Sequence, residues 1–182
     1  MNILATEVLD FWFSEKINQY WFNSTPEIDQ EISQKFESVW ELAVEGKLDE
    51  WRNTADSCLA LIIVLDQFPL NMFRNQAKSF STEAKAIEMA EYAVTHEFDR
   101  QLSNDKLIFL YMPFMHSENL ADQDRSVNLF ETAKLEANIQ FARHHRNIIQ
   151  RFGRFPHRNA ILVRDNTKAE IEYLNSKEAF LG

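Results

Sequence analysis

The chain is short of glycine and cysteine, and both shortages exclude classes of protein. Its 182 residues include three glycines, Gly46, Gly153 and Gly182, which lie far apart in the sequence. A dinucleotide-binding turn or a phosphate-binding loop needs several glycines within a few positions, so the sequence contains neither motif. The single cysteine, Cys58, excludes a disulfide framework, a cysteine-based zinc site and an iron–sulfur cluster.

Positive charge and long apolar runs are scarce as well. Nineteen Lys and Arg against 28 Asp and Glu give a net charge of −9, which disfavours nucleic acid and anionic membranes as partners. The longest apolar run, residues 58–65, is too short to span a bilayer, and Glu7 and Asp10 interrupt the pattern of a secretory signal. The sequence therefore predicts a cytoplasmic protein with no membrane partner.

Helix signals recur along the whole chain. In residues 25–46, Thr25 can cap a helix, Pro26 suits its first position, and Gly46 ends a run of apolar residues at helical spacing. Thr167 and Glu170 predict a capping box for a last helix. Apolar residues at helical spacing also occur in residues 82–94, 105–112, 121–135 and 138–152.

These patterns predict an all-α fold. The apolar run at residues 58–65 has no second candidate strand to pair with, so we predict a buried helix there too. The chain has no linker rich in proline, glycine or serine and no low-complexity tract. We therefore predict a single domain over residues 1–182, built of packed helical hairpins.

Arginines are concentrated in one part of this acidic chain. Residues 143–164 carry a charge of +6 and contain no Lys, Asp or Glu, which leaves −15 for the remainder. A guanidinium can present a planar fork of two hydrogen bonds to a carboxylate or phosphate, which an ammonium cannot. We call these six residues the arginine cluster: Arg143, Arg146, Arg151, Arg154, Arg158 and Arg164.

Residues 151–159 (RFGRFPHRN), which we call the arginine turn, are predicted to form a tight turn at the end of a helix. Gly153 ends the helix, and Pro156 restricts Phe155 to an extended conformation. On the helix before Gly153, His145 falls on the apolar stripe and should face the interior. We expect four side chains to leave regular structure and to approach one point: Arg151, Arg154, His157 and Arg158.

Polar side chains follow apolar runs in two other segments. Asp66, Gln67, Asn71 and Arg74 follow the most apolar segment, and His116, Ser117 and Glu118 follow a run bent at Pro113. A buried carboxylate without a cation is very costly. We therefore expect Asp66 and Glu118 to meet arginines of the arginine turn.

Four motifs together resemble the largely bacterial family known as domain of unknown function 924: VLDFWF, LALIIVLDQFPLNMFR, PFMHSE and HRNIIQRFGRFPHRN. The resemblance covers nearly the whole chain. It implies an all-helical fold similar to the right-handed superhelix of tetratricopeptide-like proteins, and it brings no activity, cofactor or catalytic residue with it. Where the family pattern resembles Leu-Gly-Arg, this chain has Leu162, Val163 and Arg164.

Our preferred functional prediction is that the arginine turn binds a small anionic molecule or a carboxylate of a partner protein. Six cations capable of bidentate contacts exceed the two or three carboxylates that the sequence assigns to them, which leaves charge for a ligand. The expected ligand-binding residues are Arg74, Asn71, His116, Arg151, Arg154, Arg158 and Asn159.

Two other functions stay open at this point. An enzyme built on the same residues would use His145 or His157 to transfer a proton, while Asp66 or Glu118 fixes the tautomer. A structural lattice of ion pairs accounts for the same groups. An interaction scaffold would instead use a concave face of the helical stack.

No metal or other cofactor is expected because the histidine spacing matches no known ligand set. Whether the protein forms a homodimer is left open.

Overall fold

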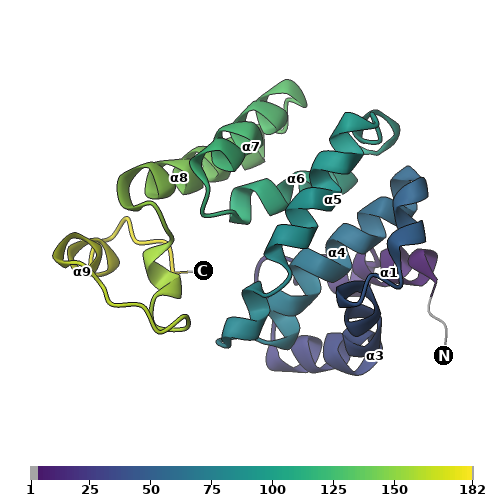
Figure 1. The fold of residues 1–182 in the computed structure, drawn as a ribbon, viewed down its shortest axis with the longest axis horizontal. Helices are drawn as coiled ribbons and strands as arrows, with labels where there is room; N and C mark the ends of the chain where they lie inside the picture. Colours follow the sequence, from purple (N-terminus) through teal and green to yellow (C-terminus); the bar gives the residue numbers. More distant parts are fainter. Residues whose placement is uncertain (1–3, 182) are drawn as a thin grey trace. The chain divides into compact units, whose positions relative to one another are not determined.

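A computed structural model describes residues 4–181 of the chain, and in this range the regular elements are helices, with no strand (Figure 1). The predicted all-α class is confirmed. The α-helices are α1 (Ala5–Trp12), α2 (Glu15–Asn18), α3 (Pro26–Val44), α4 (Ala55–Met72), α5 (Glu83–Thr95), α6 (Asn104–His116), α7 (Leu120–Thr132), α8 (Glu136–Phe152) and α9 (Lys168–Leu174). Short 3₁₀ helices are η1 (Asp49–Asn53), η2 (Ala77–Phe80), η3 (Asp99–Gln101) and η4 (Pro156–Arg158).

The helices form two compact units, which we describe separately. The N-terminal unit comprises Met1–Arg74 and Lys78–Pro113, and the C-terminal unit comprises Asn75–Ala77 and Phe114–Gly182. The boundary between them falls within α6, which continues through Pro113. The prediction of one domain and the implied superhelix concern the whole chain and stay predictions.

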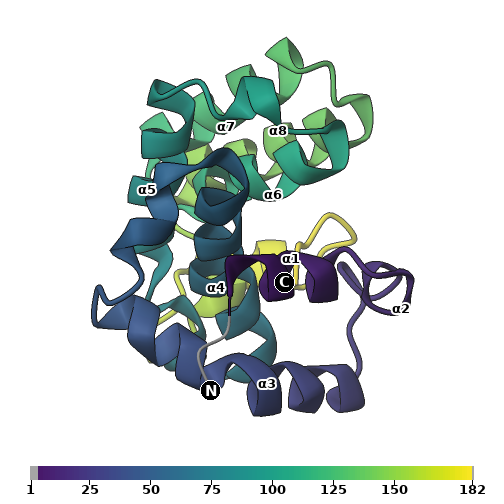
Figure 2. The same ribbon diagram turned by 90° about the vertical axis from the view of Figure 1, so that its right-hand side faces the viewer.

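Helix α4 is the core of the N-terminal unit and packs against α1, α3 and α5 (Figure 2). The helix predicted at residues 58–65 is confirmed, and its side chains there are buried. The helix is longer than the apolar run: it begins after Thr54, which caps it by accepting a hydrogen bond from Ser57 N at 3.3 Å, and it continues to Met72. Among the described residues α4 is the one helix long and apolar enough to cross a membrane, yet 72% of it is buried inside the protein. Such burial is typical of a core helix.

Several helix ends follow the local signals in the sequence. The Thr25 hydroxyl accepts a hydrogen bond from Ile28 N at 3.4 Å, and Gly46 follows α3 with a φ of +76°. At α9, Thr167 and Glu170 form the predicted capping box. These ends are determined by contacts within a few residues, which explains why they can be predicted without knowledge of the fold.

The C-terminal unit places the arginine turn at the end of a helical hairpin. Helices α7 and α8 pack side by side, and after α8 the chain passes through η4 and reaches α9, which contacts η4 (Figure 1). A hydrophobic cluster joins these elements: Ile148, Ile149, Phe155 and Tyr173, with Phe152, Leu174 and Phe180 packed against it.

Candidate functional site: the arginine turn

The backbone of the arginine turn follows the sequence prediction. Gly153 ends α8 in the left-handed conformation with a φ of +70°, and Phe155 is extended and buried. One part of the expectation is wrong. Arg151 still belongs to the last turn of α8, and His157 and Arg158 lie in η4, so Arg154 alone of the four leaves regular structure. The fixed φ of Pro156 suits the start of a 3₁₀ helix. The spacing of apolar residues does not indicate this short helix.

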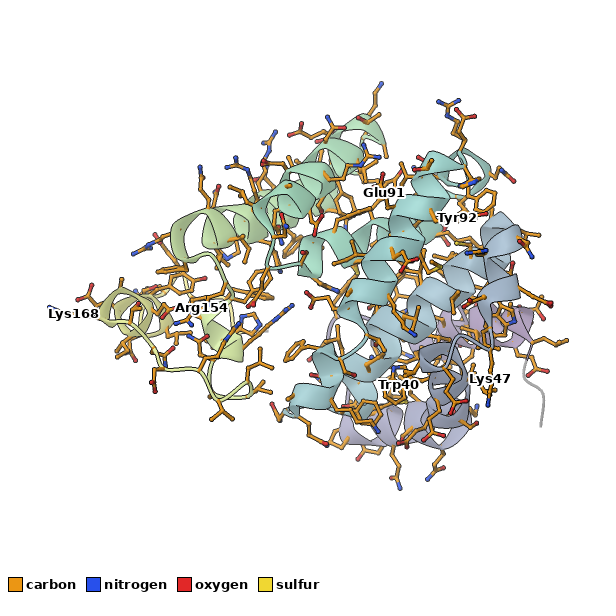
Figure 3. All side chains as sticks on the ribbon, in the orientation of Figure 1. Trp40, Lys47, Glu91, Tyr92, Arg154 and Lys168 are labelled. Atoms are coloured by element: carbon orange, nitrogen blue, oxygen red, sulfur yellow. The ribbon has the colours of Figure 1, made fainter. Side chains whose placement is uncertain are left out.

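Arg154 joins the arginine turn to the start of α9 (Figure 3, where Arg154 and Lys168 are labelled). Its Nε and Nη2 donate to the two carboxylate oxygens of Glu170 at 2.6 and 2.8 Å, and Nη2 also donates to the Asp165 carbonyl at 2.8 Å. The Glu170 side chain is 2% exposed. Hydrogen bonds from Arg154 lower the pKa of Glu170 to about 2, so the carboxylate is charged at neutral pH.

Glu118 joins the loop between α6 and α7 to the other side of the turn. Its Oε1 accepts a hydrogen bond from Phe155 N at 2.8 Å, and Arg164 donates to both carboxylate oxygens at 2.6 and 2.9 Å. Burial alone would raise the pKa of Glu118, but the hydrogen bonds from Arg164 and Phe155 N outweigh it and lower the pKa. The arginine that Glu118 meets here in a bidentate contact is therefore Arg164, which follows the turn.

Two further arginines of the cluster pair across the α7–α8 hairpin. Arg143 donates to Glu131 and Arg146 to Asp124, each at 2.6 Å. Four arginines of the cluster thus each have a carboxylate partner in the C-terminal unit: Arg143, Arg146, Arg154 and Arg164. The sequence assigned too few carboxylates because Asp124 and Glu131 face the cluster only when α7 packs against α8.

The last two arginines of the cluster differ in burial. Arg158 is buried, donates to the His116 carbonyl at 2.8 Å and lies 4.6 Å from the centroid of the Phe155 ring. Arg151 is exposed, with its guanidinium carbon 4.7 Å from the centroid of Phe152 and 5.9 Å from that of Tyr173. In the part of the chain that the structure describes, no carboxylate pairs with Arg151.

Both candidate proton-transfer histidines are held neutral. Burial lowers the pKa of His145 to about 3, and its Nδ1 lies 2.8 Å from the Phe141 carbonyl. Burial, with the positive charge of Arg158, lowers the pKa of His157 to about 4. The Nδ1 of His157 is buried and has no hydrogen-bond partner among residues 4–181. Within the C-terminal unit neither ring has a hydrogen bond to Glu118, which an acid–base pair of that kind would need.

Asn159 links the two ion pairs at the turn. It is fully buried, accepts a hydrogen bond from Arg164 Nε at 2.9 Å and donates to Asn166 Oδ1 at 2.7 Å. It also contributes to lowering the pKa of Glu170. The side chain of Asn159 therefore supports the arginines rather than facing solvent.

Three predicted site residues belong to the N-terminal unit. Arg74 donates to both oxygens of Asp29 at 2.7 and 3.1 Å, a partner that no motif indicated. Asn71 donates to the Gln67 carbonyl at 2.9 Å. The buried Asp66 accepts a hydrogen bond from Gln67 Nε2 at 2.5 Å. The pairing of Asp29 with Arg74 cannot be predicted from the sequence, because Asp29 is one of many acidic residues near helix starts. Only the fold brings the two side chains together.

Metal-ligating side chains do not gather within the described range. Residues 4–181 contain no group of three or more His, Cys, Asp or Glu side chains that could hold a metal ion.

Comparison with known proteins assigns the family. Residues 8–178 match the family described as bacterial protein of unknown function (DUF924). The chain belongs to the DUF924 family. A solved structure, that of a protein of unknown function from Agrobacterium tumefaciens, is 37% identical with a TM-score of 0.90, and the match covers 94% of this chain and 96% of that one. No curated protein matches the chain.

Proposed function

We propose that this DUF924 protein binds an anionic group at the exposed end of α8, through Arg151. The anion is a carboxylate or phosphate, carried by a small molecule or by a partner protein. The observation that supports the proposal is the state of the arginine cluster: four members pair with carboxylates of the same unit, Arg158 is buried, and Arg151 is exposed without a carboxylate in the described chain.

The surroundings of Arg151 suit this role. The Phe152 and Tyr173 rings lie against its guanidinium, and such contacts hold an arginine in place while its N–H groups stay free to donate in their own plane. The C-terminal unit carries ten Lys and Arg against nine Asp and Glu, whereas the N-terminal unit has a net charge of −10. An anion that approaches the C-terminal unit therefore meets little repulsion from that unit.

The other candidates in the turn have a supporting role in this proposal. Arg154 already contacts Glu170 with two donor groups, and Arg158 donates to a backbone carbonyl. Both hold the corner that follows Arg151. In this proposal the ion pairs of the arginine turn hold the backbone next to Arg151, and Arg151 binds the anion.

The test is titration of the full-length protein with inorganic phosphate and with succinate, measured by calorimetry. Arg151→Lys keeps the charge but loses the planar fork, and we expect it to weaken binding about tenfold, or about 1.4 kcal/mol. Arg151→Met should abolish it. Arg143→Met is the matched control because Arg143 is an exposed arginine on the same helix that already pairs with Glu131. Binding that survives in Arg151→Met, or no binding by the wild type, would overturn the proposal.

We also infer a cytoplasmic location. Cys58 is free and fully buried, and burial raises the pKa of its thiol to about 12, as suits a reducing compartment. The most apolar helix is used as the core of a folded unit. Cell fractionation checks this, because recovery of the protein with membranes or in the periplasm would contradict it.

A further inference from the structure

Phe180, which follows α9, packs on a group of histidines. The ring of Phe180 contacts those of His145, His157 and His144, with centroid distances of 4.4, 5.0 and 6.3 Å. All three contacts are edge-to-face, with interplanar angles of 62° to 87°. Phe180 also packs against the hydrophobic cluster that includes Phe155 and Tyr173. One phenylalanine ring thus occupies a position walled by imidazole and aromatic rings.

The segment that carries Phe180 is weakly attached. Helix α9 ends at Leu174, and residues 177–181 follow it without regular helix. Within the described chain, these five residues make one hydrogen bond to residues before Ser176, from Phe180 N to the Tyr173 hydroxyl at 2.9 Å. A segment that is held by one hydrogen bond and one ring can leave its position at a low free-energy cost.

Phe180 packs against the His157 ring, one polar atom of which is left unsatisfied. His157 Nδ1 is buried and has no hydrogen-bond partner in the described range. An unsatisfied buried polar atom destabilises the fold, and the hydrocarbon ring of Phe180 has no group that could form a hydrogen bond with it. A hydroxyl group could do so for either tautomer, since it donates and accepts.

We propose that the position of Phe180 is a binding site for a hydroxylated aromatic ring, and that residues 177–181 cover this site until such a ligand displaces them. His157 is the residue that recognises the hydroxyl group, and His145 packs against the ring. The low pKa values of His145 and His157 keep both rings uncharged at neutral pH, which suits a neutral phenol. The inference does not depend on Arg151, so the anion site and this site can fail separately.

The first test compares phenol with toluene, which has the same shape and no hydroxyl group. In Phe180→Ala the site is open from the start, so we expect phenol to bind about tenfold more tightly than to the wild type. Phenol should also be preferred over toluene in this variant. Leu181→Ala is the matched control, since Leu181 lies in the same segment and is 72% exposed. Histidine C–H signals in NMR titrations report the binding.

The double variant His157→Phe, Phe180→Ala separates recognition from simple filling of space. It should still bind both probes but lose the preference for phenol, because the hydrogen-bonding atom is gone. Equal affinity of Phe180→Ala and the wild type for phenol would overturn the proposal. So would a preference for phenol that persists without His157.

A second measurement uses the wild type and does not require a stable variant. Displacement of residues 177–181 should speed trypsin cleavage after Lys177, which lies in the segment. We expect phenol to accelerate the release of residues 178–182 and toluene at the same concentration to do so much less. Equal rates with and without phenol would contradict the proposal.

Discussion

At the scale of single residues, Val163 combines an unusual backbone with an unusual exposure. Its φ is +54° and its side chain is 94% exposed. A β-branched residue is disfavoured in the left-handed region, where glycine is free of the penalty. The backbone conformation of Val163 is therefore one that suits a glycine.

We therefore expect Val163→Gly to stabilise the protein by about 1 kcal/mol, since release of about 1–3 kcal/mol of strain exceeds the entropic cost of a glycine, about 0.5–1 kcal/mol. Urea unfolding measures the change. Val163→Ala is the control, because alanine removes the exposed side chain but keeps the backbone penalty. A gain as large in Val163→Ala would show that strain is not the cause.

Buried His145 and partly buried His157 predict how stability changes with pH. Above about pH 6.5 they are neutral in both the folded and the unfolded chain and add no pH dependence. As the pH falls below this value, the unfolded chain binds protons, whereas folded His145 and His157 stay neutral down to pKa values of about 3 and about 4. The free energy of unfolding should therefore fall by up to about 1.4 kcal/mol per pH unit for each histidine.

Urea unfolding between about pH 5 and pH 7 measures this slope, in a window above the pKa values of ordinary carboxylates. His145→Phe should make the slope shallower by the contribution of one proton, up to about 1.4 kcal/mol per pH unit. His96→Gln is the control for loss of an exposed histidine. An unchanged slope in His145→Phe would mean that His145 takes up its proton in the folded state as well.

At the scale of elements, ion pairs between the loops around the arginine turn should stabilise the fold more than those between exposed helix faces. The side chains of Glu118 and Arg164 are 26% and 24% exposed, against 42% and 53% for Glu131 and Arg143. Water and salt screen the second pair more strongly. The two pairs thus form a natural comparison within one unit.

Double-mutant cycles test this difference. With Glu118→Gln and Arg164→Met we expect a coupling energy of about 2 kcal/mol, because hydrogen bonds to partly buried charges contribute about 1.5–3 kcal/mol. With Glu131→Gln and Arg143→Met we expect less than about 0.5 kcal/mol. The Glu118→Gln variant keeps an acceptor for Phe155 N, so the cycle isolates the contact with Arg164. Equal coupling in the two cycles would contradict the ranking.

At the scale of the whole molecule, the chain offers a separate probe for each of its units. All four tryptophans lie in the N-terminal unit, and four of the five histidines lie in the C-terminal unit. The sequence predicts one domain, and α6 runs through the boundary without a break. We therefore expect tryptophan fluorescence and the histidine signals in NMR to report one common unfolding transition. Separate midpoints would show that the units unfold independently.

Local signals determined a large part of this fold in advance. The caps at Thr25 and Thr167, the stop at Gly153 and the burial of His145 follow from contacts or spacing within a few residues. The amphipathic pattern of each segment then selected helices throughout. This is why the all-α class and the backbone of the arginine turn could be predicted.

Only the tertiary structure decided which charged side chains form ion pairs and which residue covers the histidines. Asp29 and Arg74 are 45 residues apart, and Glu118 and Arg164 are 46 apart, so no local pattern pairs them. Phe180 reaches His145 because α9 folds back on the end of α8. A short stretch of sequence determines backbone conformation through steric and hydrogen-bonding preferences, whereas partners distant in sequence meet through the packing of whole helices.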